Sequence, residues 1–350
     1  MTSPSLPDAP AGTLDPVAVA TTLVGIDSTS GREGEVVAAA ERLLLERGWT
    51  TLRIPVSDGR DDLLATGSPA PLVTLSTHLD TVPPFLPPRL EGGRLYGRGA
   101  CDAKGIAAAM ICAGERLRDA GIPVALLFVV GEETTHDGAH AANESELVPS
   151  TSRVLINGEP TESVLAVGTK GALRFTITTE GLAAHSAYPH LGRSATAALV
   201  RLLAELDALP LPHDPVLGDT TINIGQLSGG VADNVTAPRA AARLMARLVT
   251  PADELMALLR DWVGDRARLE AGVTVPPVRL GVVDGFPTAV VAYATDIPAL
   301  TRWGTPYLFG PGSIHVAHTA DEHVDVAELR AAVDAYVRLA TSALRREERC

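Results

Sequence analysis

Cysteine and long apolar runs are both scarce in this sequence, and each shortage excludes a class of protein. The three cysteines, Cys101, Cys112 and Cys350, form neither a CxxC pair nor a disulfide framework, so we expect a protein of a reducing compartment. No uninterrupted apolar run approaches the ~20 residues that a transmembrane helix needs. The N-terminal segment has no basic stretch followed by an apolar one, so we expect no signal peptide and a cytoplasmic location.

Positive charge is also in short supply. The chain has 29 Lys and Arg against 42 Asp and Glu, which gives a net charge of −13. It has no basic patch, so we expect neither a nucleic acid nor a membrane as a partner. With 350 residues, 46% of them hydrophobic, the chain is long enough for a large core and more than one domain.

Strands and helices alternate through the first half of the chain, which predicts an α/β domain. The pattern predicts helices over 16–26, 33–47 and 105–120, and strands over 50–54, 72–77, 124–130 and 154–156. Polar residues follow several of these strands directly, and open α/β sheets bind ligands at the carboxyl ends of their strands.

The middle of the chain changes to two strand–helix–strand pieces, which predict a small α+β sandwich inserted into the larger domain. The predicted strands cover 164–167, 173–179, 221–227 and 240–249, and the predicted helices cover 194–208 and 251–271. Later the sequence predicts a helix over 288–302, a strand over 305–309 and a helix over 326–344. We therefore expect a larger domain of residues 1–169 and 285–350, and an inserted domain of residues 170–284.

Chemically active side chains stand at the ends of separate predicted strands or in turns. They are His78, Asp102, Glu132–Glu133, Glu159, and the histidines of the segment GPGSIHVAHTADEH. Any one of them alone is explained by a helix cap or a hydrogen-bonded histidine. Together at one sheet edge they would cost solvation free energy unless one or two divalent cations compensated them. Imidazole and carboxylate groups are the ligands that zinc accepts.

In this order the motifs HLDT, GRGACDAKG, GEE, GEPT and GPG…AH resemble those of a zinc amidohydrolase and peptidase family. That family includes acetylornithine deacetylase, succinyl-diaminopimelate desuccinylase, aminoacylase and carboxypeptidase G2, and the late segment is most similar to the acetylornithine deacetylase branch. The resemblance implies an α/β metallopeptidase-type catalytic domain with a central mixed sheet flanked by helices. It also implies that the inserted α+β sandwich is a lid and dimerisation domain.

The resemblance further implies two zinc ions per chain, with cobalt as a substitute. His78 and Glu159 would be ligands of one ion, Glu133 and His318 would be ligands of the other, and Asp102 would bridge both. Each ion then has three protein ligands and an open position. The family also places a cis peptide bond directly after the bridging aspartate.

Two further acids are assigned catalytic roles. We expect Asp80 to accept a hydrogen bond from the second ring nitrogen of His78 and to fix its tautomer. The resemblance implies that Glu132, rather than the adjacent Glu133, is the general base, which takes a proton from the attacking water and delivers it to the leaving amine. The alternative for Glu132 is a charge at a helix N-terminus.

The family motif ends with the histidine just before the acidic pair, which favours His318 over His315. The other histidines of the catalytic domain and lid are interpreted as surface residues: His136, His140, His190, His213, His315 and His323.

The segment GLAAHSAYPHLGRSA in the inserted domain resembles the family pattern GxxAHSxxPxxGxNA, with Arg193 where Asn or Val is common. In the family the equivalent of His185 reaches across a dimer interface and stabilises the oxyanion. Asn234 and Arg247 would hold the substrate carboxylate. Their alternatives are a turn asparagine and a strand-edge arginine.

The sequence thus predicts a homodimeric, metal-dependent amidohydrolase that converts N2-acetyl-L-ornithine to ornithine and acetate, a step of arginine biosynthesis. Alternative activities are those of a succinyl-diaminopimelate desuccinylase, an N-acetyl-lysine or N-acetyl-citrulline deacetylase, a carrier-protein-linked lysine or ornithine hydrolase, or a dipeptidase. A metal-binding homologue without catalysis is disfavoured by the intact Glu132. A dinucleotide-binding oxidoreductase would need GxGxxG, and the glycines of GRLYGRGACDAKG do not have that spacing.

Overall fold

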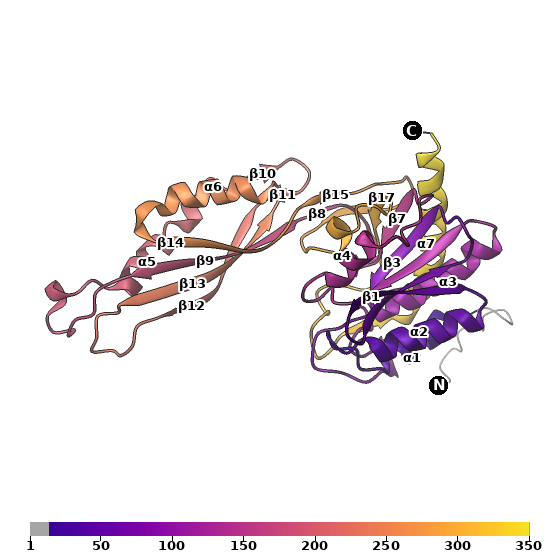
Figure 1. Ribbon diagram of the computed structural model, residues 1–350, viewed down its shortest axis with the longest axis horizontal. Coiled ribbons are helices and arrows are strands. Elements are labelled where there is room, and N and C mark those ends of the chain that lie inside the picture. Colours follow the sequence, from indigo (N-terminus) through magenta and orange to yellow (C-terminus); the bar gives the residue numbers. More distant parts are fainter. Residues whose placement is uncertain (1–13, 350) are drawn as a thin grey trace. The chain divides into compact units, whose positions relative to one another are not determined.

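The structure, a computed structural model, describes residues 14–349, and its chain forms two units (Figure 1). The first unit comprises the chain up to Val167, Leu280–Ala289 and the chain from Thr295 on. The second comprises Gly168–Arg279 and Val290–Ala294, where the sequence predicted an inserted domain of 170–284. The expectation about a signal peptide and the pairing of Cys350 lie outside the described residues.

A six-stranded mixed sheet forms the centre of the first unit. In order across the sheet its strands are β1 (Thr50–Ser57), β2 (Arg60–Thr66), β6 (Val124–Val129), β3 (Val73–His78), β7 (Val154–Asn157) and β17 (Thr305–Leu308). The last four run parallel, and β2 is antiparallel to both of its neighbours. The carboxyl ends of β3, β6 and β7 therefore lie at one edge of the sheet.

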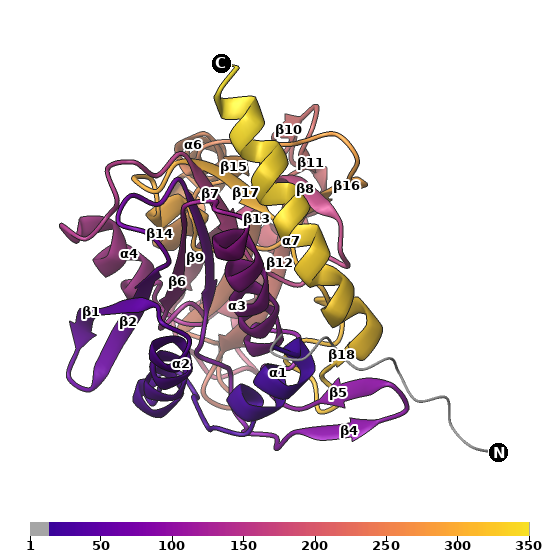
Figure 2. The same ribbon diagram turned by 90° about the vertical axis from the view of Figure 1, so that its right-hand side faces the viewer.

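Helices cover both faces of this sheet, because its central strands are apolar on both sides. Along β6, Leu126 and Phe128 belong to one buried cluster, and Leu127 and Val129 belong to another. The first cluster includes residues of α1 (Pro16–Val24), α2 (Gly34–Glu46), α3 (Lys104–Asp119) and α7 (Val326–Glu347). The second includes α4 (Asp137–Glu144), on the other side of the sheet from α3 and α7 (Figure 2).

The second unit is an α+β sandwich. Its antiparallel sheet has the order β12 (Thr221–Gly229), β13 (Arg239–Leu248), β9 (Gly171–Glu180) and β14 (Arg268–Val275). Residues of α5 (Ala195–Leu203) and α6 (Ala252–Val263) share a core with alternate residues of β9 and β13. Burial alternates along β13, from buried Leu244 and Ala246 to half-buried Met245, because successive side chains of a strand point to opposite faces and one face packs against α5 and α6.

Short strands complete the fold. They are β4 (Arg89–Glu91), β5 (Arg94–Tyr96), β8 (Leu165–Thr169), β10 (His213–Asp214), β11 (Gly218–Asp219), β15 (Val278–Arg279), β16 (Thr288–Val291) and β18 (His323–Asp325). β5 pairs with β4 and β18, and β8 lies between β15 and β16. Within residues 14–349, no helix has the length and apolar character needed to cross a membrane.

One predicted helix is wrong, and another is too long. The segment 288–302 is not a helix but β16 followed by bends and the single 3₁₀ turn Ile297–Ala299. Pro298 lies inside the predicted helix, where it lacks an N–H and clashes with the preceding turn. The predicted helix 251–271 ends at Val263, because Gly264 has a φ of 50°, and the following residues pair with β9 as β14 instead.

Candidate metal centre

The chemically active residues of the first unit gather at the carboxyl edge of its parallel strands. His78 is the last residue of β3, Glu132–Glu133 follow β6, and Glu159 follows β7. Asp102 precedes α3, and the peptide bond that joins it to Ala103 is cis, as the family resemblance implied. Because all these segments end at one edge, residues distant in the sequence become neighbours.

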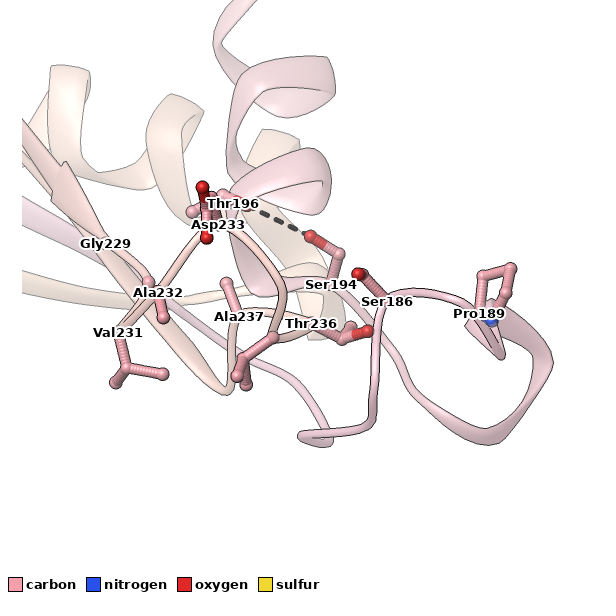
Figure 3. A pocket seen from close by; sticks show the side chains of 12 residues that line it. Ser186, Pro189, Ser194, Thr196, Gly229, Val231, Ala232, Asp233, Thr236 and Ala237 are labelled. Atoms are coloured by element: carbon pink, nitrogen blue, oxygen red, sulfur yellow. Dashed lines mark hydrogen bonds between the residues drawn. The ribbon is translucent and has the colours of Figure 1, made fainter.

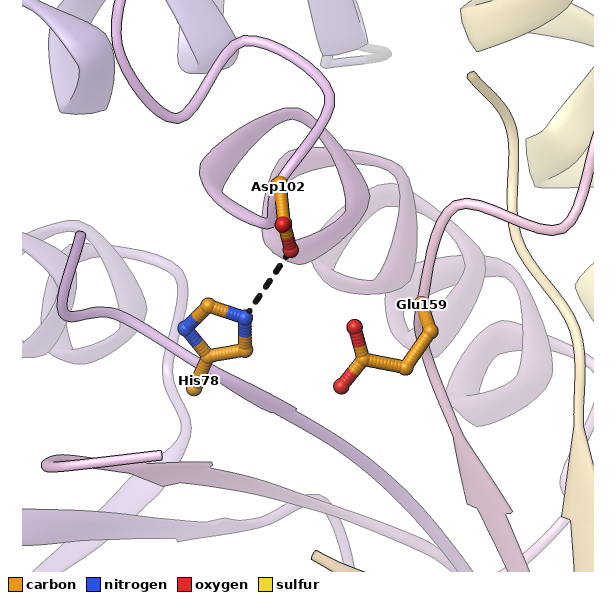
Figure 4. Close-up of side chains that lie close together, drawn as sticks. All are labelled: His78, Asp102 and Glu159. Atoms are coloured by element: carbon orange, nitrogen blue, oxygen red, sulfur yellow. Dashed lines mark hydrogen bonds and ion pairs between the residues drawn. The ribbon is translucent and has the colours of Figure 1, made fainter. Parts of the chain in front are cut away.

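The first group consists of His78, Asp102 and Glu159, all buried (Figure 4). His78 Nε2 lies 3.2 Å from Asp102 Oδ1, and ligand atoms of the three residues lie within 4.8 Å of one another. Glu159 Oε1 is buried and has no hydrogen-bond partner among the described residues. A buried oxygen of this kind is stabilised when a cation binds it.

The second group shares Asp102 with the first and adds Glu133 and His318. His318 Nε2 lies 2.9 Å from Glu133 Oε1 and 3.3 Å from Asp102 Oδ2. The two oxygens of Asp102 therefore face different histidines, which is the arrangement of a bridging carboxylate. Hydrogen bonds to Asp102 and Glu133 raise the pKa of His318 to about 10, so the site attracts positive charge. His315 is exposed and belongs to neither group.

These donors fit two divalent cations, each with three protein ligands of the nitrogen and oxygen type that zinc accepts. The charge of the site supports this reading. Burial raises the pKa of Glu159 well above its ordinary value, and the nearby Asp102 adds to the effect. Buried carboxylates that are not compensated destabilise the fold, and bound cations remove that penalty.

Asp80 contacts His78, as the sequence predicted, and it also binds the backbone of Glu132 and Glu133, which the sequence did not predict. His78 Nδ1 lies 3.0 Å from the backbone carbonyl oxygen of Asp80 and 3.4 Å from its carboxylate. A proton on Nδ1 donated to this carbonyl leaves Nε2 free to bind metal. The Asp80 carboxylate accepts the backbone N–H groups of Glu132 and Glu133, at 3.1 and 3.2 Å, and the hydroxyl of Ser30 at 2.7 Å.

Glu132 is fixed beside both groups but belongs to neither. Burial raises the pKa of Glu132 well above its ordinary value, and the negative charge of Glu159 raises it further. A carboxylate with a raised pKa is a stronger base in its ionised form, as general base catalysis requires.

Sequence reasoning missed Glu322, which organises the segment that carries Asp102. Its buried carboxylate pairs with Arg98 and accepts the backbone N–H groups of Gly99, Cys101 and Asp102, at 2.8, 3.4 and 3.3 Å. In the sequence Glu322 belongs to the acidic pair that begins three residues after His318, and this pair indicates only which histidine is the ligand. Nothing local in the sequence links it to a turn some 220 positions earlier.

The surface interpretation of His136 is also wrong. Only 21% of its side chain is exposed, and its Nδ1 lies 2.8 Å from the buried Asp296 Oδ1 and 3.9 Å from Glu132 Oε1. The position of His136 four residues after Glu132 was the one feature of the sequence that could have indicated that the two side chains are close. Asp296 could not be connected to it, because the segment around Asp296 was predicted to be helical.

Two of the predicted residues of the second unit are neighbours. The backbone N–H of Ser186 donates to the carbonyl oxygen of Asn234 at 2.9 Å, and His185 forms an isolated bridge with Val235. The N–H of Ala187 donates to His185 Nδ1 at 3.2 Å. Beside them is a cavity of about 670 Å³, lined by Ser186, Ser194, Gly229, Gly230, Asp233 and Thr236 among others (Figure 3).

Arg247 is not close to this pair within the second unit. Strand β13 begins at Arg239, shortly after the loop that carries Asn234, and Arg247 lies near the other end of the strand. There Arg247 pairs with Ala172 of β9. Burial lowers the pKa of Arg247, and the positive charge of Arg174 lowers it further. Two guanidinium groups that repel each other in this way favour an anion nearby.

An α/β fold with two overlapping sets of metal ligands beside a basic carboxylate, at the carboxyl edge of its sheet, defines a metal-dependent hydrolase. Comparison with known proteins gives the family. Residues 74–342 match Peptidase family M20/M25/M40, and the chain belongs to it. A probable carboxypeptidase of Aspergillus clavatus is 38% identical over 93% of this chain and 81% of its own length.

Solved structures confirm the predicted fold class. The aminopeptidase PepT of Bacillus cereus matches with a TM-score of 0.79 and 19% identity over 94% of this chain and 98% of its own. A metallo-carboxypeptidase of Sulfolobus solfataricus matches with a TM-score of 0.72 and 16% identity over 95% and 99%. The predicted family is confirmed by the family match over residues 74–342 and by the Aspergillus relative. The Aspergillus relative is called a carboxypeptidase, so the deacetylase branch stays a prediction.

Proposed function

We propose that the protein hydrolyses the amide bond between an acyl group and the amino nitrogen of an α-amino acid, with N2-acetyl-L-ornithine as the leading substrate. The observation that carries this proposal is the pair of ligand groups that share Asp102, with Glu132 beside them. Two zinc ions held there, or cobalt in their place, would supply Lewis acidity to the substrate carbonyl and to the attacking water.

The chain's own residues account for the proton movements. Water adds its oxygen to the carbonyl carbon, and Glu132 accepts the proton that this water loses. The carbon–nitrogen bond then breaks, and Glu132 delivers the proton to the amine nitrogen. The Asp80 carboxylate accepts the Glu132 backbone N–H at 3.1 Å, so the backbone from which the Glu132 carboxylate extends is fixed before substrate binds.

A second candidate is removal of the C-terminal residue of a short peptide, and the carboxypeptidase name of the relatives favours it. Both reactions break an amide bond whose nitrogen belongs to an amino acid with a free carboxylate. Arg247 beside Arg174 and Asn234 are our candidates for binding that carboxylate. The two activities then differ in the acyl side of the substrate, which is a simple acyl group in the first and a peptide in the second.

We also propose that the protein acts as a homodimer, and that His185 stabilises the oxyanion across the subunit interface, as the family resemblance implies. Strand β12 is an edge of its sheet, and Ile224 and Leu227 on it are exposed. Exposed apolar edge strands are templates for pairing with another chain. Leu227→Lys should therefore give monomers in sedimentation, whereas Leu90→Lys, at a position that is also 56% exposed, should not.

Mixing inactive variants tests the role of His185. A His185→Ala chain and a Glu132→Ala chain should regain turnover when they form heterodimers, because one active site then receives both intact residues. Heterodimers without turnover would refute contribution across the interface.

The first experiment is amide hydrolysis on a substrate panel, with the metal content measured on the same preparation. The panel contains N2-acetyl-ornithine, N-acetyl-lysine, N-acetyl-citrulline, N-succinyl-diaminopimelate, a carrier-linked lysine, dipeptides and N-blocked dipeptides. Turnover that chelation abolishes and zinc or cobalt restores, at two metals per chain, is expected. Fastest cleavage of the peptides would favour the carboxypeptidase activity, and bound metal without any turnover would favour a non-catalytic homologue.

A further inference from the structure

A third group of ligand atoms lies next to Glu132, outside the two groups that share Asp102. It consists of Glu132, His136 and Asp296, and one ligand atom of each lies within 4.8 Å of the others. Both carboxylates approach the same ring nitrogen, since His136 Nδ1 is 2.8 Å from Asp296 Oδ1 and 3.9 Å from Glu132 Oε1. One nitrogen carries at most one proton, so it can donate to only one of the two carboxylates. A cation between them can bind all three groups.

The backbone places these groups without a ligand. His136 has a φ of 55°, in the left-handed region where histidine is more frequent than most residues. Its N–H donates to the carbonyl oxygen of Gly131 at 2.9 Å, which closes the turn that carries Glu132. The Asp296 carbonyl oxygen accepts the N–H of Ala299 at 2.9 Å. The three groups are therefore held on two tight turns.

Negative charge exceeds positive charge around His136. Asp296 is 1% exposed, and its Oδ2 has no hydrogen-bond partner among the described residues. Asp62 is also buried, its Oδ1 accepts the N–H of Val130 at 3.0 Å, and its Oδ2 likewise has no partner within residues 14–349. Burial raises the pKa of Asp62, and the charge of Asp296 contributes to that rise. The Arg60 guanidinium also acts on Asp62, but it is ion-paired with Glu33 and Asp137. The buried carboxylates therefore outnumber the cationic groups near them, which favours a bound cation.

We propose that Glu132, His136 and Asp296 form a third, inhibitory site for a divalent transition-metal ion such as zinc. One imidazole and two carboxylates are a ligand set that zinc binds with a fourth position left to solvent. Occupation of this site removes Glu132 from proton transfer, because a carboxylate bound to a cation no longer accepts a proton from water. The inhibition rests on the proposed function, whereas binding of the third ion does not.

The experiment titrates the full-length protein, already holding two metals per chain, with zinc. Bound zinc is counted by equilibrium dialysis, and hydrolysis of the best panel substrate is measured on the same samples. The matched variants are His136→Asn and His140→Asn. Asparagine tolerates the left-handed backbone of residue 136, and His140 is an exposed residue of α4 nearby. Asp296→Asn is a second test variant of nearly the same shape.

The wild-type protein and His140→Asn should bind a third zinc ion and lose turnover as it binds. His136→Asn and Asp296→Asn should bind one ion fewer and need at least ~10-fold more zinc for half inhibition, each relative to its own activity without added zinc. A third ion that both test variants still bind, or inhibition that they retain unchanged, would overturn the site. If no panel substrate is cleaved, the proposed function fails, and the difference of one bound ion still tests the third site.

Discussion

The Glu322 carboxylate offers the sharpest test of how the metal centre is built. It is 1% exposed and forms an ion pair with Arg98, which is 2% exposed. It also accepts backbone N–H groups of the turn that ends in Asp102. Glu322→Gln keeps the shape and one acceptor oxygen but removes the charge, so the Arg98 guanidinium is left buried without a counter-ion.

The expected loss of stability is large for an isosteric change. Breaking a buried ion pair by removing one charge costs about 3–5 kcal/mol. The matched control is Asp325→Asn, because Asp325 pairs with Arg94 at 3.2 Å while both side chains are about half exposed. Exposed pairs of this kind contribute far less, because solvent screens both charges. Because the Glu322 turn also orients Asp102, metal affinity should fall by about 10–100-fold.

Chemical denaturation of the metal-free proteins measures the first effect, and competition with a chelator of known affinity measures the second. A second variant, Arg98→Met combined with Glu322→Gln, should recover much of the lost stability, since no buried charge then remains unpaired. It should not recover all of the metal affinity. Equal unfolding free energies for Glu322→Gln and Asp325→Asn would refute the reasoning, as would unchanged metal affinity in Glu322→Gln.

Three further predictions follow from the described residues. Glu132→Gln should retain two metals and lose about 10²–10⁴-fold in kcat, and turnover near the wild-type value would exclude Glu132 as the base. Gly304→Ala should be destabilised by ~1–3 kcal/mol more than Gly121→Ala in denaturation, because both have a positive φ but only the Cβ at residue 304 would meet backbone atoms, the nearest being the Arg153 carbonyl carbon at 2.4 Å. Burial raises the pKa of Cys112 to about 12, so iodoacetamide should label it at pH 8 only after unfolding. The same shift predicts that the unfolding free energy falls as the pH rises from 9 toward 12, since the unfolded thiol ionises first.

Much of the first unit was predictable from local patterns. The uninterrupted apolar run of β6 could only be a strand or helix buried on all sides, and its length favoured the strand. The polar residues after β3, β6 and β7 were predicted to form a ligand site because ligands bind at the carboxyl edge of such a sheet. The wrong helix over 288–302 shows the limit of this approach, because pairing of Thr288–Val291 with β8 outweighed the local preference.

The sequence by itself determined which side chains could bind metal and that strand ends would present them, because composition and periodicity are local properties of the chain. Only the tertiary structure decided how they meet. It places Asp102 between His78 and His318, secures that arrangement with Glu322, and brings Asp296 to His136. These partners lie 24 to 220 positions apart in the chain, and pairing at such separations depends on strand order and on the direction of each side chain. The spacing of residues along a single segment specifies neither the strand order nor these side-chain directions.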